Sequence, residues 1–327
     1  MANNEVIYMA KEQMENTVDK KPEVADKSNG CPCSIKQLLI IIIPIAFVVL
    51  FAVIFIPVYL KNKNDEKDEV YEEEAEFDEY DENIVNITYA TLTPKNGYDH
   101  IFIFLGGISD VSNKYFDFFK GNHTFIPKGT KIYFLSGNPR QMAFMDHYYP
   151  QLAGQYFPGW FNVDENGILV PPDDFDQAKE SLELILNEID RIKAEEDVDY
   201  KDIFLGGFSQ GGIMTNYVLL NSRHELGGYL AFSGYILDHD FPSSSVVTSL
   251  SDTQKNKLEA RKNYHILATH SFNDNAVFYN SATSTYSTYY KEYTDFQLYS
   301  FGNLRHVLPE QPIHTIVKKW LKESMEK

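Results

Sequence analysis

Short apolar runs recur along the chain from about residue 84 to its C-terminal end. Each run is rich in Ile, Phe or Tyr and is bounded by Gly, Asn or Asp, which is typical of buried strands in a parallel sheet. Between the runs lie segments with helical periodicity, the clearest of which places apolar residues from Phe175 to Ile192 on one face. A last helix is expected from Ile313 to about Glu326. The predicted strands are His100–Leu105, Lys131–Leu135, Asp202–Gly207, Tyr229–Ser233, Tyr264–Thr269 and Phe296–Phe301.

This alternation of strands and helices determines the predicted fold class. Strands separated by helical segments are expected to form a mostly parallel sheet with helices on both of its faces. The sequence therefore predicts one doubly wound α/β domain over residues 84–327. The composition agrees, because 43% hydrophobic and 14% aromatic residues are ample for a large core.

A different pattern precedes this domain. Residues 1–37 are polar and are expected to be a disordered tail. Leu38–Leu60 then runs for 23 residues without a charge. As a helix this segment is about 34 Å long, and a bilayer core is about 30 Å thick. The sequence therefore predicts a single-pass membrane protein. The flanking basic residues are nearly balanced, and so leave open the side on which the domain lies.

The charge of the chain is concentrated in the stretch that follows. Between Asp65 and Glu82 there are twelve Asp or Glu residues and one Lys, and this run supplies most of the net charge of −18. Residues 61–83 are therefore predicted to be a solvated acidic linker. Clustered Lys and Arg are absent from the sequence, which argues against a nucleic-acid partner. The only cysteines, Cys31 and Cys33, precede the α/β domain, so a catalytic thiolate or a cysteine metal site is excluded there.

The sharpest chemical signal is a G-x-S-x-G motif centred on Ser209. It directly follows a strand-like run and directly precedes a helix-like one. A nucleophile elbow needs this context, because the strained turn between strand and helix projects the hydroxyl outward. The glycines that flank the serine allow the close backbone approach at such a turn. Ser209 is therefore the predicted nucleophile.

A serine nucleophile needs a histidine as base and a carboxylate that holds the tautomer of that histidine. Both partners are expected in loops that follow later strands, with the acid first in chain order. His306 follows the last predicted strand, and Asp274 follows the strand before it. Asp238 and Asp240 follow an earlier strand and remain alternatives for the acid.

The same chemistry requires two backbone donors for the oxyanion. One is expected from the residue after the nucleophile, Gln210, and the other from a loop after an early strand. The glycine-rich run Phe104–Asp110 supplies such a loop, with Ile108 as the second donor. The reaction expected of this arrangement needs no metal and no cofactor.

The sequence resembles the acyl-protein thioesterase and carboxylesterase group of α/β-hydrolases, also called the phospholipase/carboxylesterase family. The resemblance covers roughly residues 98–325 and implies Ser209, Asp274 and His306 as the triad. It also implies action on thioesters of lipidated proteins, on lysophospholipids or on small carboxyl esters. The matching stretches are IFIFLGGISD, YFPGWFNV, LGGFSQGGIMTNYVL, YLAFSGYIL, HILATHSFNDNAV and FGNLRHVLPEQ.

The sequence departs from the family pattern at three places. The family's His-Gly before the oxyanion donor is Gly106-Gly107 here, and its His-Gly before the acid loop is His270-Ser271. The Asp of its Trp-Phe-Asp motif is Asn162, after Trp160 and Phe161. These changes leave the triad intact and bear on substrate preference and rate.

The segment Tyr148–Phe161 is dense in aromatic residues. It could line an acyl-chain channel, with Trp160 and Phe161 contacting substrate, or it could simply pack on the domain, and the sequence leaves both interpretations open. The function predicted from the sequence is that of a membrane-anchored serine hydrolase acting on acylated proteins or lipids. A general carboxylesterase, a lysophospholipase and a catalytically silent binding protein with the same fold remain alternatives.

Overall fold

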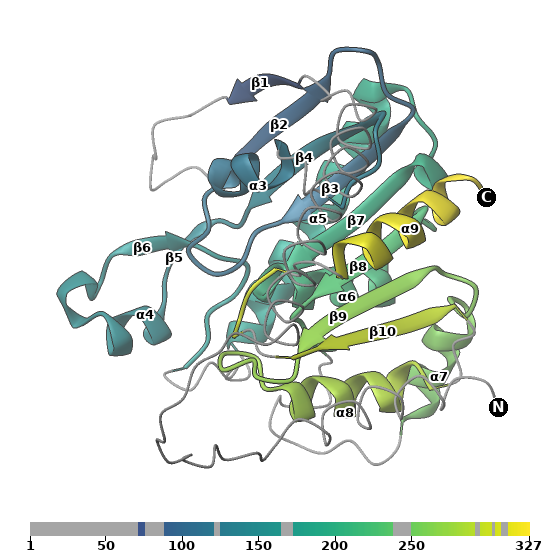
Figure 1. Cartoon of the computed structure of the whole chain (residues 1–327). Helices are drawn as coiled ribbons and strands as arrows, with labels where there is room; N and C mark the ends of the chain where they lie inside the picture. The colour runs from purple at the N-terminus through teal and green to yellow at the C-terminus, as the bar shows by residue number, and fades with distance from the viewer. Residues whose placement is uncertain are drawn as a thin grey trace, which may run out of the picture. The chain divides into compact units, whose positions relative to one another are not determined.

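The computed structural model describes residues 71–75, 88–120, 125–164, 173–237, 250–291, 295–302, 305–308 and 313–327 (Figure 1). The predicted tail at residues 1–37 and the alternative acids Asp238 and Asp240 lie outside these residues. Within the described part of the chain, one eight-stranded sheet has the order β1-β2-β4-β3-β7-β8-β9-β10. Its strands are β1 (Tyr71–Ala75), β2 (Thr88–Pro94), β3 (His100–Leu105), β4 (Thr130–Ser136), β7 (Ile203–Phe208), β8 (Gly228–Phe232), β9 (Ile266–Ser271) and β10 (Phe296–Phe301).

The mostly parallel α/β sheet predicted from the sequence is confirmed. The strands β4, β3, β7, β8, β9 and β10 pair parallel in that order, whereas β2 pairs antiparallel with both β1 and β4. Each of the six predicted strands corresponds to one of the parallel strands, with ends that differ by no more than two residues. Parallel strands bury both faces, which is why they are apolar without alternation and easy to find in the sequence.

Helices cover both faces of this sheet, and each face has its own apolar core. On one face α5 (Asp173–Glu196), α6 (Gln210–Asn221), α7 (Asp252–Glu259) and α8 (Tyr279–Tyr289) pack against alternate residues of the strands, such as Ile101 and Ile103. On the other face α3 (Phe116–Lys120) and α9 (Ile313–Met325) pack against the intervening residues, such as Phe102 and Phe104. The predicted helices around 175–192 and 313–326 correspond to α5 and α9.

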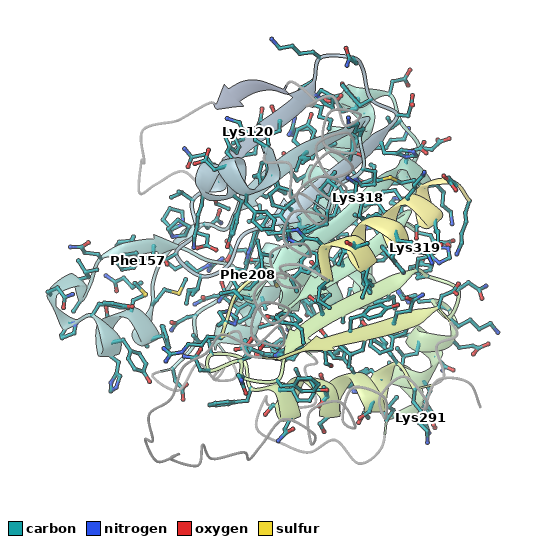
Figure 2. All side chains as sticks on the ribbon, viewed as in Figure 1. Lys120, Phe157, Phe208, Lys291, Lys318 and Lys319 are labelled. Carbon is teal, nitrogen blue, oxygen red and sulfur yellow. The ribbon has the colours of Figure 1, made fainter. Side chains whose placement is uncertain are left out.

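A small excursion separates β4 from α5. It contains the two-stranded sheet of β5 (Pro139–Gln141) and β6 (Tyr156–Pro158), joined through α4 (Ala143–Tyr148), and it extends away from the main sheet (Figure 1). Phe157 on β6 lies within this excursion (Figure 2). Short 3-10 turns at Ser112–Tyr115, Pro150–Leu152 and Tyr200–Asp202 complete the described elements.

The sheet extends further toward the N-terminus than the apolar pattern predicts. β2 reads TYATLTP, and its alternating threonines hide a strand that pairs antiparallel with β4. β1 reads YEEEA and lies inside the stretch predicted to be a linker, where it pairs with β2 as the edge strand. Charged residues are typical of edge strands, because they discourage pairing with another chain. Residues 71–75 of the acidic stretch thus form a strand, and the linker role of the stretch stays a prediction.

The predicted single-pass membrane localisation is corrected by the helices that the structure describes. Of these helices, none combines the length and the apolar character needed to cross a bilayer. α5 has 24 residues but carries charged residues throughout, and α6 is largely apolar but has only 12 residues. The segment Leu38–Leu60, on which the prediction depended, lies outside the described residues.

Close backbone packing joins α6 to the centre of the sheet. A Cβ added at Gly211 would lie 2.1 Å from the carbonyl oxygen of Leu105, and one at Gly207 would lie 2.4 Å from the backbone of Gly211. Real Cβ atoms do not approach backbone atoms this closely. The glycines of the G-x-S-x-G motif therefore let the first turn of α6 contact β3 and β7 directly.

We expect Gly211→Ala to destabilise the domain by about 3 kcal/mol, because the added methyl group cannot be accommodated without moving α6 or β3. Chemical denaturation measures the effect. Gly97→Ala is the matched control, since a Cβ there meets no atom within 4 Å and only the positive φ of 87° is strained. The control should cost about 1 kcal/mol. Equal losses in the two variants would contradict this account of the packing.

Candidate active site

Ser209 occupies the sharp turn between β7 and α6. Its backbone has φ 57° and ψ −119°, a conformation that non-glycine residues rarely adopt. The turn is fixed on both sides, because the Ser209 N–H donates to the Phe232 carbonyl (2.9 Å) and its own carbonyl accepts from the Ile213 N–H (3.0 Å). The side chain of Ser209 does not cap the helix. The strained turn thus holds a half-buried hydroxyl at the N-terminal end of α6.

The structure brings Asp274 and His306 together from two different loops. Asp274 follows β9 and His306 follows β10, and these strands are parallel neighbours whose C-terminal ends meet at one edge of the sheet. Nδ1 of His306 lies 2.8 Å from Oδ2 and 3.0 Å from Oδ1 of Asp274. A carboxylate can only accept, so Nδ1 donates, and Nε2 is the nitrogen that can accept a proton whenever the ring is neutral.

Asp274 is held as an ion inside the protein. Its side chain is fully buried, and Oδ1 also accepts hydrogen bonds from the N–H groups of Ala276 (3.0 Å) and Val277 (2.8 Å). Burial by itself raises the pKa of this carboxyl, but the hydrogen bonds and charge of His306 and the two backbone donors outweigh it. The pKa of Asp274 therefore lies below its ordinary value, and the group is ionised at neutral pH.

The ring of His306 also lies beside the elbow. It packs on Phe208, the residue immediately before Ser209, with ring centroids 4.7 Å apart and planes 32° apart. Phe208 is labelled in Figure 2 at the end of β7. The side chain of His306 is 18% exposed, so the imidazole is accessible while its carboxylate partner is buried.

In the turn after β3, most backbone N–H groups donate a hydrogen bond to an acceptor within the protein. The N–H of Gly106 donates to Leu135 (3.0 Å), that of Ser109 to Pro158 (2.8 Å) and that of Asp110 to Gly107 (3.3 Å). The N–H of Gly107 donates to the side chain of Asp110 (2.8 Å). Among the described residues, the N–H of Ile108 has no acceptor within this turn. The turn lies against the elbow, because a Cβ on Gly107 would be 3.3 Å from the Cβ of Ser209.

Asp110 holds this turn in place, although its role could not be predicted from the sequence. Its carboxylate is 3% exposed and also accepts from the Tyr115 hydroxyl and from Nζ of Lys114. Burial, followed by the charge of Asp110, raises the pKa of Tyr115 well above its ordinary value, so the phenol remains a donor. The only feature of the sequence that could have indicated this role is that Asp110 is the one acidic residue in the glycine-rich loop.

The side chain of Gln210 connects the elbow to the segment that follows the excursion. Its Oε1 accepts from the Trp160 N–H (2.8 Å), and its Nε2 donates to the Phe161 carbonyl (2.6 Å). The indole N–H of Trp160 in turn donates to the Gly106 carbonyl (2.8 Å). Trp160 and Phe161 are 1% and 0% exposed. The structure therefore gives these two residues a packing role beside the turn after β3, and their contact with substrate stays a prediction.

The three departures from the family pattern also have places in the structure. Gly106 supplies the carbonyl that Trp160 binds. Oδ1 of Asn162 accepts from the N–H of Ala143 (3.0 Å), the first residue of α4. Ser271 is buried at the end of β9, and its Oγ accepts from the N–H of Asn273 (3.2 Å). None of these positions interrupts the contact between Asp274 and His306.

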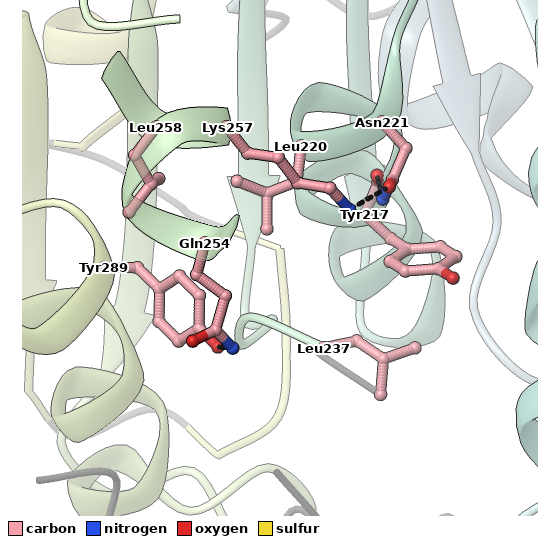
Figure 3. Close-up of a pocket in the computed structure, with 8 residues that line it drawn as sticks. All are labelled: Tyr217, Leu220, Asn221, Leu237, Gln254, Lys257, Leu258 and Tyr289. Atoms are coloured by element: carbon pink, nitrogen blue, oxygen red, sulfur yellow. Dashed lines mark hydrogen bonds between the residues drawn. The ribbon is translucent and has the colours of Figure 1, made fainter. Parts of the chain in front are cut away.

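A small cavity of about 60 Å³ lies apart from these residues. It is enclosed by α6, α7 and α8, and the hydrogen bond from Lys257 to Asn221 crosses one side of it (Figure 3). Its nearest lining residue on α6, Tyr217, is eight positions after Ser209, which is roughly 12 Å along a helix. The cavity is therefore separate from the elbow.

The fold and this constellation define an α/β-hydrolase: a serine at a strained strand-to-helix turn, with a carboxylate and a histidine after later strands of a mostly parallel sheet. Residues 93–324 match the family described as Phospholipase/Carboxylesterase, and the chain belongs to that family. Its relatives are named acyl-protein thioesterases and carboxylesterases, so it is a family of ester-hydrolysing enzymes.

Individual relatives match only parts of the chain. Acyl-protein thioesterase 1 of Kluyveromyces lactis is 34% identical over 86 residues, which are 25% of this chain and 36% of the relative. A protein of Oryza sativa named probable carboxylesterase is 28% identical over 178 residues, or 53% of this chain and 62% of the relative. The crystal structure of Zea mays acyl-protein thioesterase 2 superposes with a TM-score of 0.55 at 19% identity, covering 72% of this chain and 98% of the other.

We expect Asp274→Asn to lower the free energy of unfolding by about 1–2 kcal/mol at pH 7, because a charge-assisted hydrogen bond is lost. The pKa of Asp274 is depressed in the folded state, so its stabilising contribution is present above the unfolded pKa of about 3.9 and is lost as the pH falls through the folded value.

The difference between wild type and variant should therefore shrink below about pH 4, as measured by urea denaturation across pH. The control Asp176→Asn, in an exposed side chain, should change stability little at any pH. A difference for Asp274→Asn that stays constant down to pH 2 would contradict the depressed pKa.

Proposed function

We propose that the protein is a serine hydrolase that cleaves carboxylic ester or thioester bonds of acylated proteins or lipids, with Ser209, His306 and Asp274 as its catalytic triad. The observation that carries the proposal is the hydrogen bond between Nδ1 of His306 and the buried carboxylate of Asp274. The same imidazole packs on the residue before Ser209. This arrangement supports the roles of nucleophile, base and acid in the order that α/β-hydrolases use.

The proposed reaction proceeds in two acyl-transfer steps. Nε2 of His306 accepts the proton of Ser209 as its oxygen attacks the carbonyl carbon, and Asp274 stabilises the imidazolium that forms. His306 then returns the proton to the leaving thiol or alcohol as the bond to the acyl group breaks. A water molecule, deprotonated by the same nitrogen, attacks the acyl-enzyme. His306 then returns this proton to the oxygen of Ser209 as its bond to the acyl group breaks, which releases the carboxylic acid.

The N–H groups of Ile108 and Gln210 are the proposed oxyanion donors. The hydrogen bonds of the turn after β3 support Ile108, since they engage the neighbouring N–H groups. Gln210 is the first residue of α6, where backbone N–H groups have no partner within the helix and the helix dipole favours negative charge. Donors that are already in place stabilise the tetrahedral intermediate without having to reorganise.

The surface around the site favours a substrate with an apolar acyl group. In the described part of the chain, the exposed large hydrophobic side chains all lie on loops or short elements that follow the C-terminal ends of parallel strands. Ligands of open α/β sheets bind outside the C-terminal ends of the strands, so these side chains are in a position to contact an apolar acyl group. They are Val111 after β3, Tyr148, Tyr149 and Tyr156 after β4, and Phe272 and Phe278 after β9.

Ser209→Ala is expected to abolish labelling by a fluorophosphonate probe and to lower hydrolysis by about a thousandfold or more. Palmitoyl thioester, lysophosphatidylcholine and short-chain p-nitrophenyl esters form the substrate panel. A preference for the thioester would support the acyl-protein assignment over lysophospholipase or general carboxylesterase action. Ser287→Ala, at an exposed position of α8, is the control. Folded wild type that is neither labelled nor active would instead indicate a silent binding protein.

Ile108→Pro removes the proposed donor, and we expect kcat to fall by about 100- to 1000-fold. Ile108→Ala keeps the N–H group and should retain kcat within about tenfold of wild type. Steady-state kinetics on the best substrate of the panel measures both variants, with thermal unfolding to verify that each is folded. Equal losses for Pro and Ala would show that the side chain, rather than the N–H, matters at this position.

A further inference from the structure

His270 is a second histidine close to the proposed acid, and the mechanism above gives it no role. It is the penultimate residue of β9, and its side chain is fully buried, as is that of Asp274. Its Nε2 lies 3.5 Å from Oδ2 of Asp274. The edge of its ring faces Tyr279 on α8, with centroids 5.9 Å apart. His270 therefore lies on the inner side of Asp274, and His306 lies on the more exposed side.

A short chain of hydrogen bonds connects His270 to the acid through the backbone. Nε2 of His270 lies 2.8 Å from the carbonyl oxygen of Val277. The N–H of Val277 donates to Oδ1 of Asp274 at 2.8 Å. The first contact uses the carbonyl of Val277 and the second uses its N–H. The imidazole therefore holds in place the residue whose N–H orients the carboxylate. The loop from residue 272 to 278 is thereby fastened back onto β9.

The hydrogen bond to Val277 determines the tautomer of His270. A carbonyl oxygen can only accept, so Nε2 carries the proton and donates it. Burial lowers the pKa of His270, which leaves the ring neutral at pH 7. The titratable groups around it are Asp274, His306 and Tyr279. A neutral ring adds no charge beside Asp274, so its contribution to the carboxylate is geometric.

The loop needs such a fastening because its flanks are exposed. Phe272 is 49% and Phe278 is 64% exposed, and the side-chain packing of the segment is limited to the ring contact of Phe272 with Tyr279 (4.8 Å) and the partly buried Val277. The N–H of Phe272 donates to Phe301 on β10 (2.7 Å), which fixes the beginning of the loop. The hydrogen bond from His270 to Val277 fixes its end. Both points of attachment are strands of the sheet.

We propose that His270 is a positioning residue for the hydrolytic reaction: by donating Nε2–H to the Val277 carbonyl, it holds the Asp274 loop so that the carboxylate meets Nδ1 of His306. This inference rests on the proposed function of the triad and adds a residue to it. His270 touches neither substrate nor the reacting atoms. Its effect is on the orientation of Asp274, and through Asp274 on the tautomer and direction of His306.

Two amide substitutions of nearly equal size test the proposal. In His270→Gln the amide nitrogen can occupy the position of Nε2 and donate to Val277. In His270→Asn the shorter side chain places its amide nitrogen near the position of Nδ1, out of reach of Val277. We expect His270→Gln to keep kcat within about threefold of wild type. His270→Asn should lower kcat by about 10- to 100-fold, as a small misplacement of catalytic groups does, with KM within about twofold.

A second measurement, by proton NMR, tests the hydrogen bond between His306 and Asp274 without requiring catalytic turnover. The proton between Nδ1 of His306 and Asp274 should give a low-field proton resonance that persists in His270→Gln and is weakened or lost in His270→Asn. A residue that merely fills the core would change thermal stability in both variants and would not separate them in kcat or in this resonance. If His270→Asn does not fold, His270→Leu, which fills the site without a donor, takes its place.

The outcomes separate this inference from the proposed function. Equal kcat values and equal resonances for the folded Gln and donor-free variants would overturn the positioning role. Wild type that is not labelled by fluorophosphonate, or Ser209→Ala that remains active, would overturn the proposed function. In that case the resonance still decides whether His270 positions Asp274.

Discussion

Backbone contact between α6 and the centre of the sheet is the constraint on which the rest of the site depends. The elbow, the turn after β3 and the first turn of α6 approach so closely that a methyl group at Gly207 or Gly211 would overlap backbone atoms. This contact forces Ser209 into its strained backbone conformation and leaves the first N–H groups of α6 beside the turn that contains Ile108. Strain of this kind persists only where the surrounding structure over-determines it.

Three loops surround the elbow, and each is fastened by buried polar groups. Asp110 binds the turn after β3, and the side chain of Gln210 binds the segment around Trp160. The backbone donors of Ala276 and Val277 bind Asp274. Buried polar groups are costly unless they are satisfied, so each such contact favours one loop conformation over its alternatives. A rigid sheet edge and fastened loops together make the preorganised geometry that acyl transfer requires.

Much of the fold could be predicted because parallel strands are uniformly apolar. The six predicted strands and the helices α5 and α9 follow directly from runs and periodicities in the sequence. β2 was missed because its threonines alternate with apolar residues, and β1 because its glutamates resemble a solvated linker. Both strands pair antiparallel at one edge of the sheet. There, pairing depends on the neighbouring strand more than on the strand's own composition. The excursion with β5, β6 and α4 has no periodic signal at all.

The positions of Ser209, Asp274 and His306 could be predicted because each residue follows a strand. The motif around Ser209 and the order of the three residues along the chain can both be read from the sequence. The sequence by itself determined the α/β class, the elbow and the candidates for base and acid. Only the tertiary structure decided which groups hold these residues, because Asp110, Gln210 and His270 act through hydrogen bonds whose acceptors and donors are set by three-dimensional packing. The packing of Trp160 and Phe161 beside the turn after β3 was decided in the same way, since burial depends on what the fold places around a side chain.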